Sequence, residues 1–95
     1  MDRRNQAKAL ILRLVAAAGE GGLEGRTRLY KAFYFAHLYY FHETSLPLTA
    51  WNVVNMPEGP GIDQGPILIK ELEVSGLLVA EPIYVGPFVS ERYRV

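Results

Sequence analysis

Residues 27–43, TRLYKAFYFAHLYYFHE, decide the fold of this chain. Seven of these seventeen residues are Phe or Tyr, and neither Gly nor Pro interrupts them, so the stretch predicts one long helix. Its apolar side chains cover nearly the whole helix surface, leaving one polar sector made by Thr27, Arg28, Lys31 and His42. A helix that is apolar nearly all round is normally buried. We therefore expect the central helix of a domain, or a helix with one face in the core and one on a partner.

Length and composition indicate one small domain spanning residues 1–95. Hydrophobic residues at 49% and charged residues at 21% fit a compact soluble protein. Ten basic side chains balance ten acidic ones, which leaves no overall field toward nucleic acid or anionic lipid. The absence of Cys excludes disulfides and thiolate metal sites and favours a reducing compartment, so we expect a cytoplasmic protein.

The N-terminal segment has the rough outline of a signal peptide, with a basic start followed by an apolar run. Arg13 lies in the middle of that run, and an ionised guanidinium is costly inside a membrane. The run is also far shorter than the ~20 residues that span a bilayer. We therefore expect no membrane partner. The apolar spacing instead predicts an amphipathic helix over residues 2–18, capped by Asp2.

Between this first helix and the central one, residues 19–26 predict a loop, because glycines crowd its first half. We expect Leu23 to pack back onto the core and Thr27 to form the N-cap of the central helix. After the central helix, residues 48–54 predict a short strand rich in Thr, Trp and Val. Residues 56–61 then predict a tight loop.

A third helix follows, for which we expect Asp63 as the N-cap, Pro66 in the first turn and Gly76 at the C-terminal end. Residues 77–95 predict a β-hairpin whose turn is Gly86-Pro87. We expect the strand at 48–54 to add a third strand to this hairpin. The order of elements predicts an α+β, winged-helix-like fold with three helices and a small antiparallel sheet that ends in a wing.

Four groups of residues also follow the order of motifs in a known family. They are residues 27–37 (TRLYKAFYFAH), residues 46–49 (LPLT), residues 56–60 (MPEGP), and Leu72 with residues 76–78 (GLL). Over residues 23–79 the pattern resembles the Panacea domain, the antitoxin-associated domain that includes SocA-like proteins. The resemblance implies a protein-interaction role, either toxin neutralisation or delivery of a toxin to a protease. The chain departs from the family in its shorter length and at residues 61–63, where the family has a Val-rich segment.

No pattern of residues indicates catalysis. His37 and His42 are the only histidines, and five residues apart on a helix they cannot chelate one metal as an i, i+4 pair would. We expect His37 to be hydrogen-bonded in the core and His42 to lie on the surface. Gly59, Gly61 and Gly65 miss the spacing of a phosphate loop by one residue, and Pro60 and Pro66 lack the N–H donors that a phosphate needs. We expect no enzymatic activity, no metal and no cofactor.

Two apolar segments predict a surface for a protein partner. Residues 83–89, IYVGPFV, are unusually apolar for the exposed tip of a hairpin, and Phe35 and Tyr39 fall on the polar side of the central helix. Aromatic side chains are favoured at the centre of interfaces. The expected partner-binding residues are Phe35, Tyr39, Tyr84, Val85 and Phe88. The partner is a toxin-like protein or a second copy in a homodimer, unless the wing folds back onto the core.

The alternative function is a winged-helix DNA-binding transcriptional regulator. The third helix is a poor DNA reader, because it carries Lys70 against Glu71 and Glu73, and the wing tip has no basic residue. DNA would then be met by basic residues elsewhere in the chain. The candidates are Arg3, Arg4, Lys8, Arg13, Arg26, Arg28 and Lys31.

Overall fold

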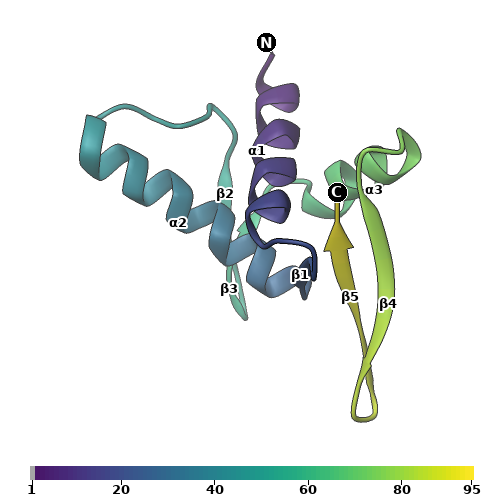
Figure 1. The fold of residues 1–95 in the computed structure, drawn as a ribbon. Coiled ribbons are helices and arrows are strands. Elements are labelled where there is room, and N and C mark those ends of the chain that lie inside the picture. Colours follow the sequence, from purple (N-terminus) through teal and green to yellow (C-terminus); the bar gives the residue numbers. More distant parts are fainter. Residues whose placement is uncertain (1) are drawn as a thin grey trace.

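Three helices and five short strands make up the chain in the computed structural model, which describes residues 2–95 (Figure 1). In chain order the elements are α1 (Arg3–Ala17), β1 (Leu23–Glu24), α2 (Arg26–Thr44), β2 (Val53–Met56), β3 (Gly59–Ile62), α3 (Gly65–Val74), β4 (Val79–Val85) and β5 (Phe88–Arg94). The strands form two antiparallel sheets, one of three strands and one of two. The predicted α+β class, with three helices and small antiparallel sheets, is confirmed.

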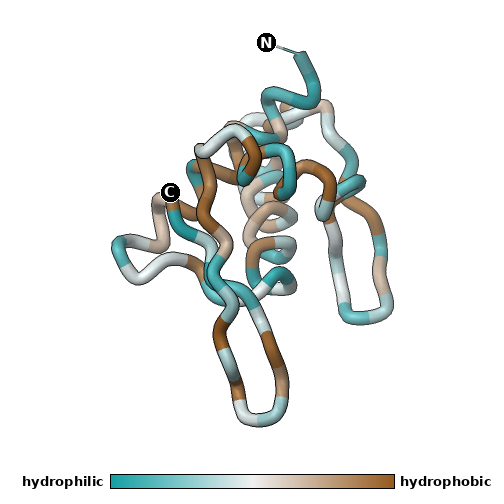
Figure 2. Tube along the Cα trace, turned by 90° about the vertical axis from the view of Figure 1, so that its right-hand side faces the viewer, coloured by the Kyte–Doolittle hydropathy of each residue, from teal (hydrophilic) through white to brown (hydrophobic). Residues whose placement is uncertain are grey.

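The larger sheet has the strand order β1-β5-β4. The hairpin predicted for the end of the chain is confirmed, since β4 and β5 pair from Val79 opposite Arg94 to Val85 opposite Phe88. Its two-residue turn begins with Gly86 at φ 60°, which suits a type II′ turn because that turn favours Gly at its first central position. Figure 2 shows this hairpin projecting from the body of the molecule, with hydrophobic segments near its tip.

The third strand of this sheet is β1, so the expectation of a loop throughout residues 19–26 is wrong at its centre. Leu23 lies opposite Tyr93 and Glu24 lies opposite Arg92. Leu23 is half-buried and packs against the core, as predicted. A two-residue strand is too short to show any hydrophobic alternation, and only the neighbouring strand supplies its hydrogen-bond partners.

The expectation that residues 48–54 extend the wing sheet is also wrong. The strand begins at Val53 and pairs with β3 to form a separate hairpin, closed where Met56 lies opposite Gly59. The sequence of β3 is Gly-Pro-Gly-Ile, and Gly and Pro are depleted in strands, so residue preferences conceal it. Pro60 is tolerated there because each strand of a two-stranded ribbon is an edge strand.

One hydrophobic core joins the three helices and both sheets. Its buried side chains are Ala7, Ile11, Val15, Leu29, Tyr30, Phe33, Ile62, Leu68, Ile69, Leu72, Leu78 and Tyr93. The helix α3 buries the apolar side chains of Leu68, Ile69 and Leu72, and α1 buries Ala7, Ile11 and Val15, which are spaced four residues apart. Both helices therefore present the face that their apolar periodicity indicates.

The helix α2 is buried along its first half only. Leu29, Tyr30 and Phe33 lie in the core, whereas every residue from 38 to 44 is exposed. Figure 1 shows the far end of α2 extending away from the other helices and from both sheets. Tyr40 and Phe41 are therefore exposed, because no other element covers the last turns of the helix.

Two predicted helix caps are wrong. The helix α2 follows Gly25, whose φ is 92°, and so it begins one residue before Thr27. The helix α3 follows Gln64, whose φ is 53°, so Asp63 lies outside it. Neither helix start has a side-chain cap. At the start of α2 the chain is held against β5 instead, since the Gly25 N–H donates to the Glu91 carbonyl at 2.8 Å.

The other two end signals are confirmed. The Asp2 carboxylate accepts a hydrogen bond from the Asn5 N–H at 2.7 Å at the start of α1. Gly76 follows Ser75, the C-cap residue of α3. Its φ of 79° is the left-handed conformation that commonly ends helices.

Replacing Phe33 by Ala is expected to destabilise the fold by about 3–5 kcal/mol, because the ring is fully buried and its loss leaves a cavity. Chemical denaturation followed by far-UV circular dichroism measures this change. The control is Val74→Ala at the end of α3, outside the apolar end of α2, whose side chain is 78% exposed and whose loss should cost less than about 1 kcal/mol. A near-neutral result for Phe33→Ala would contradict the placement of this helix.

Candidate functional site

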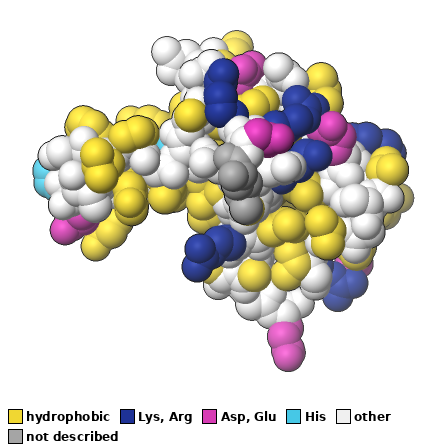
Figure 3. Space-filling model, turned by 90° about the horizontal axis from the view of Figure 1, so that it is seen from above, with side chains coloured by type: hydrophobic (Ala, Val, Ile, Leu, Met, Phe, Trp, Pro, Cys, Tyr) yellow, Lys and Arg dark blue, Asp and Glu magenta, His cyan; other side chains and the backbone are white. Residues whose placement is uncertain are grey.

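The most prominent apolar surface is the exposed end of α2 with the loop after it, residues 35–46, which we call the arm. Figure 3 shows hydrophobic side chains along this projection from the body. Its large exposed side chains are Phe35, Leu38, Tyr39, Tyr40, Phe41 and Leu46. Glu43 is the only Asp, Glu, Lys or Arg in the arm. Tyr39 is the most exposed of them, at 70%.

Hydrogen bonds hold the arm to the rest of the molecule at its base. His37 Nδ1 lies 2.8 Å from the Phe33 carbonyl and Nε2 lies 2.6 Å from Thr49 Oγ1. A carbonyl oxygen only accepts, so Nδ1 donates, and in the neutral ring Nε2 accepts from the Thr49 hydroxyl. The ring is half-buried and packs against Phe33 with centroids 4.6 Å apart. His37 thus has the hydrogen-bonded role that the sequence predicts, and it ties the returning loop to the arm.

The far end of the arm is also ordered by local hydrogen bonds. The Thr44 hydroxyl donates to the Tyr40 carbonyl at 2.7 Å and accepts from the Leu46 N–H at 3.1 Å. Ser45 ends the helix with φ 60°, and its N–H donates to the Phe41 carbonyl at 2.7 Å. The arm is therefore a helix whose C-terminal end is closed by hydrogen bonds and whose aromatic side chains are exposed.

The wing tip is a second, smaller apolar surface. Tyr84 is 79% exposed and Phe88 is 72% exposed, so the alternative that the wing folds back onto the core is wrong. Tyr84 pairs with Val89 on one face of the hairpin, and Val85 pairs with Phe88 on the other. Because adjacent side chains alternate between faces, the tip is apolar on both sides. The structure thus exposes all five predicted partner-binding residues, in two separate groups.

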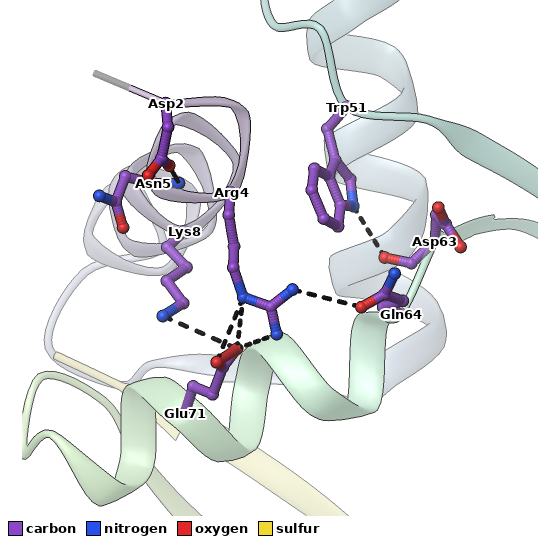
Figure 4. Close-up of polar contacts among 8 residues, drawn as sticks. All are labelled: Asp2, Arg4, Asn5, Lys8, Trp51, Asp63, Gln64 and Glu71. Carbon is purple, nitrogen blue, oxygen red and sulfur yellow. Dashed lines mark hydrogen bonds and ion pairs between the residues drawn. The ribbon is translucent and has the colours of Figure 1, made fainter.

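Within residues 2–95, three of the seven basic candidates for nucleic-acid binding form ion pairs. Arg4 of α1 reaches Glu71 of α3, donating from Nε to Oε2 at 2.9 Å, and its Nη1 lies 3.3 Å from Gln64 Oε1 (Figure 4). Lys8 Nζ lies 3.7 Å from the same Glu71 carboxylate, and these cations lower the pKa of Glu71, mainly through the hydrogen bond from Arg4. Arg26 pairs with Glu91 at 3.4 Å.

The remaining basic candidates do not form one surface. Arg3 lies over the Trp51 ring, 5.8 Å from its centroid, and Arg13 is exposed on α1. Arg28 and Lys31 are exposed together on the first half of α2. The outer face of α3, which the alternative function would place against DNA, exposes the apolar side chains of Ile67 and Val74. This face is better suited to apolar contact than to base readout.

An open cleft of about 690 Å³ lies between the start of α2 and β5. Residues 24–28 and Lys31 line one side, and residues of β5 that include Ser90, Glu91 and Tyr93 line the other. The cleft brings together the Arg26, Arg28 and Lys31 candidates. The sequence shows no signal for it, because the cleft depends on the pairing of the two-residue strand β1 with β5.

Two buried tyrosine hydroxyls lie near the cleft. Burial raises the pKa of both Tyr30 and Tyr93, and the nearby Arg26 guanidinium partly offsets this. Neither hydroxyl meets a partner at hydrogen-bond distance and angle among residues 2–95, although Tyr93 lies close enough to Arg26 to raise the pKa of that guanidinium. Tyr30 packs on α3, where a Cβ added at Gly65 would lie 2.5 Å from its hydroxyl.

Other kinds of site find no support in the described part of the chain. Over residues 2–95 no three His, Asp or Glu side chains are grouped as metal ligands would be. His42 is exposed, as predicted. Among the helices of residues 2–95, none combines the length and the apolar character that crossing a bilayer requires.

Comparison with known proteins gives no relative: the sequence matches no family model and no curated protein, and no solved structure is significantly similar to the fold. The resemblance to the Panacea domain therefore rests on the residues quoted from the sequence, and the winged-helix-like description stays a prediction.

Raising the pH above about 10 is expected to destabilise the fold through Tyr30 and Tyr93. Burial raises both pKa values above those of the unfolded chain. The stabilisation that the protonated hydroxyls give the fold is therefore complete below the unfolded pKa, and it is lost as the pH rises through the folded pKa. Between pH ~8 and pH ~11, the free energy of unfolding measured with urea should fall less in Tyr93→Phe than in the wild type. Equal losses in the two proteins would contradict a raised pKa at Tyr93.

Proposed function

We propose that this domain is a non-enzymatic protein-interaction module and that the arm is its interface, on which a second copy of the chain packs. The observation that carries this proposal is the exposure of five large apolar side chains on the end of α2 and of a sixth, Leu46, in the loop after it. Isolated exposed apolar residues are common on any protein, but a contiguous patch of this kind marks an interaction site.

The size of the arm fits a dimer interface. Its six side chains are between 37% and 70% exposed, which leaves on the order of 600 Å² of apolar surface if a fully exposed side chain presents about 200 Å². A standard interface buries about 800 Å² on each partner. Residues 38–41 are consecutive and point to different sides of the helix, so two arms side by side would bury part of this area, to which the flanking loop adds.

The chemistry of the arm favours its own copy as the occupant. From residue 35 to residue 41 it carries no Asp, Glu, Lys or Arg, so it offers no charge pattern for a charged partner. Interfaces between identical subunits are more apolar than transient ones. A two-fold axis also lets one helix face cover the same face of its copy, so a single sequence supplies both halves of the interface.

The family resemblance gives the biological direction of the proposal. A Panacea-type domain acts by contacting another protein, as an antitoxin or as an adaptor for a toxin. The wing tip, with Tyr84, Val85 and Phe88, is a second apolar surface on the same domain. A dimer through the arms leaves both wing tips free for such a partner.

DNA binding by a winged-helix regulator is the alternative. It would use the basic side chains that carry no ion pair within residues 2–95, chiefly Arg28 and Lys31 on α2. The apolar outer face of α3 and the lack of basic residues at the wing tip weigh against it. We therefore rank it below the interaction module.

The test is the molar mass of the protein in solution, measured by light scattering across a concentration series. The wild type is expected to be a dimer, and Phe35→Ala combined with Tyr39→Ala is expected to be a monomer with unchanged circular dichroism. Both side chains are exposed in the single chain, so their loss should leave the fold intact.

The matched control is Tyr84→Ala combined with Phe88→Ala, which removes two exposed aromatic side chains from the wing tip. This variant should remain a dimer. A monomeric wild type at every concentration would contradict the proposal, and so would a dimer lost in the wing variant but kept in the arm variant.

A further inference from the structure

We propose that the dimer formed through the arm is sensitive to pH, and that protonation of His42 dissociates it. This inference rests on the proposed function, because it assigns a means of regulation to the same interface. Two observations carry it. His42 lies on the apolar face of the arm, and residues 35–42 contain no Asp, Glu, Lys or Arg.

His42 shares one face of α2 with the apolar side chains that a second copy would cover. It follows Phe35 by seven residues, Leu38 by four and Tyr39 by three. Side chains at these spacings stand one above another on a helix. All four are exposed in the single chain. Packing of Phe35 and Tyr39 against a second copy therefore covers His42 as well.

This face points away from the core of the molecule. At about 100° per residue it lies opposite Leu29, Tyr30 and Phe33, the three side chains that α2 buries. Every residue from 38 to 44 is exposed, so the structure leaves this face open to a second copy.

Few charged groups lie near His42. Since the last turns of α2 are exposed, its neighbours belong to the arm itself. Glu43, the only carboxylate of the arm, comes next in the chain and points about 100° away from His42 around the helix. The next ionic side chain along the same face is Lys31, eleven residues and about 16 Å toward the start of α2. The apolar face thus offers no counter-ion for an imidazolium.

A charge on His42 opposes the dimer whichever way the two helices run. In a parallel pair, His42 lies against the same residue of the second copy, and two imidazolium ions repel each other. In an antiparallel pair, it lies against Phe35 of the second copy, or against Lys31 where the helices overlap further. Covering a charge with apolar groups or placing it beside another cation is unfavourable.

The direction of the pH dependence follows from proton binding. A histidine side chain ordinarily changes its charge between pH 5 and 8. In this range two separate chains bind more protons than the dimer, because the interface excludes the imidazolium form. Lowering the pH therefore shifts the equilibrium toward single chains. The dimer is favoured at pH ~8 and is lost as the pH falls toward 5.

The test is the dissociation constant of the dimer, measured by analytical ultracentrifugation at pH ~8 and pH ~5.5 at constant ionic strength. For the wild type it should rise on the order of 100-fold at the lower pH, because each dimer excludes two protons. His42→Gln should remain a dimer with similar dissociation constants at both pH values. His42→Lys carries its charge at both and should be largely monomeric even at pH ~8.

The matched control is Glu43→Gln, which removes the only carboxylate of the arm and should dissociate in acid as the wild type does. The inference is overturned if this variant loses the pH dependence or if His42→Gln keeps it. The latter result would point to His37, the other histidine, which is half-buried at the base of the arm.

Two further outcomes separate this inference from the proposed function. A wild-type dimer with the same dissociation constant at both pH values contradicts the role of His42 and leaves the arm interface standing. A wild type that is monomeric at pH ~8 at every concentration contradicts the arm dimer, and the role of His42 with it.

Discussion

The fold depends on the packing of one half of one helix. Leu29, Tyr30 and Phe33 of α2 are the buried residues of that helix, and α1, α3 and both sheets close around them. At 19 residues, α2 is about 28 Å long, while the second largest extent of the whole domain is 29 Å. The core covers only the first half of that length, since every residue from 38 to 44 is exposed. The arm is the part that the core leaves uncovered.

The start of the same helix is fixed by a different constraint, the pairing of β1 with β5. The Gly25 N–H bonds to the Glu91 carbonyl, and this contact brings the first turn of α2 against the last strand of the chain. Arg26 consequently lies beside Tyr93, although the two are far apart in the sequence. The cleft, its cations and its buried hydroxyl therefore follow from a sheet contact that involves two residues of β1.

Charged and exposed aromatic side chains are distributed unevenly over the molecule. Several cations serve internal contacts: Arg4 and Lys8 join α1 to α3 through Glu71, and ion pairs to Glu24 and Glu81 link the strands through Arg92 and Arg94. The projecting elements, the arm and the wing, instead expose aromatic side chains. Interaction with other proteins would thus use the projections.

The sequence by itself determined the elements whose signals are local. The apolar periodicity of α1 and α3, the uninterrupted length of α2, the Gly86-Pro87 turn, and the end signals Asp2 and Gly76 all depend on near neighbours in the chain, and all are present in the structure. Periodicity indicates which face of a helix is apolar, but it does not say how far along the helix a covering element extends. That limit is set by distant segments. Only the tertiary structure therefore decided that Tyr39 and Phe41 are exposed, that Leu23 joins β5, that Gly59–Ile62 forms a strand, and that Tyr93 and Arg26 share one cleft.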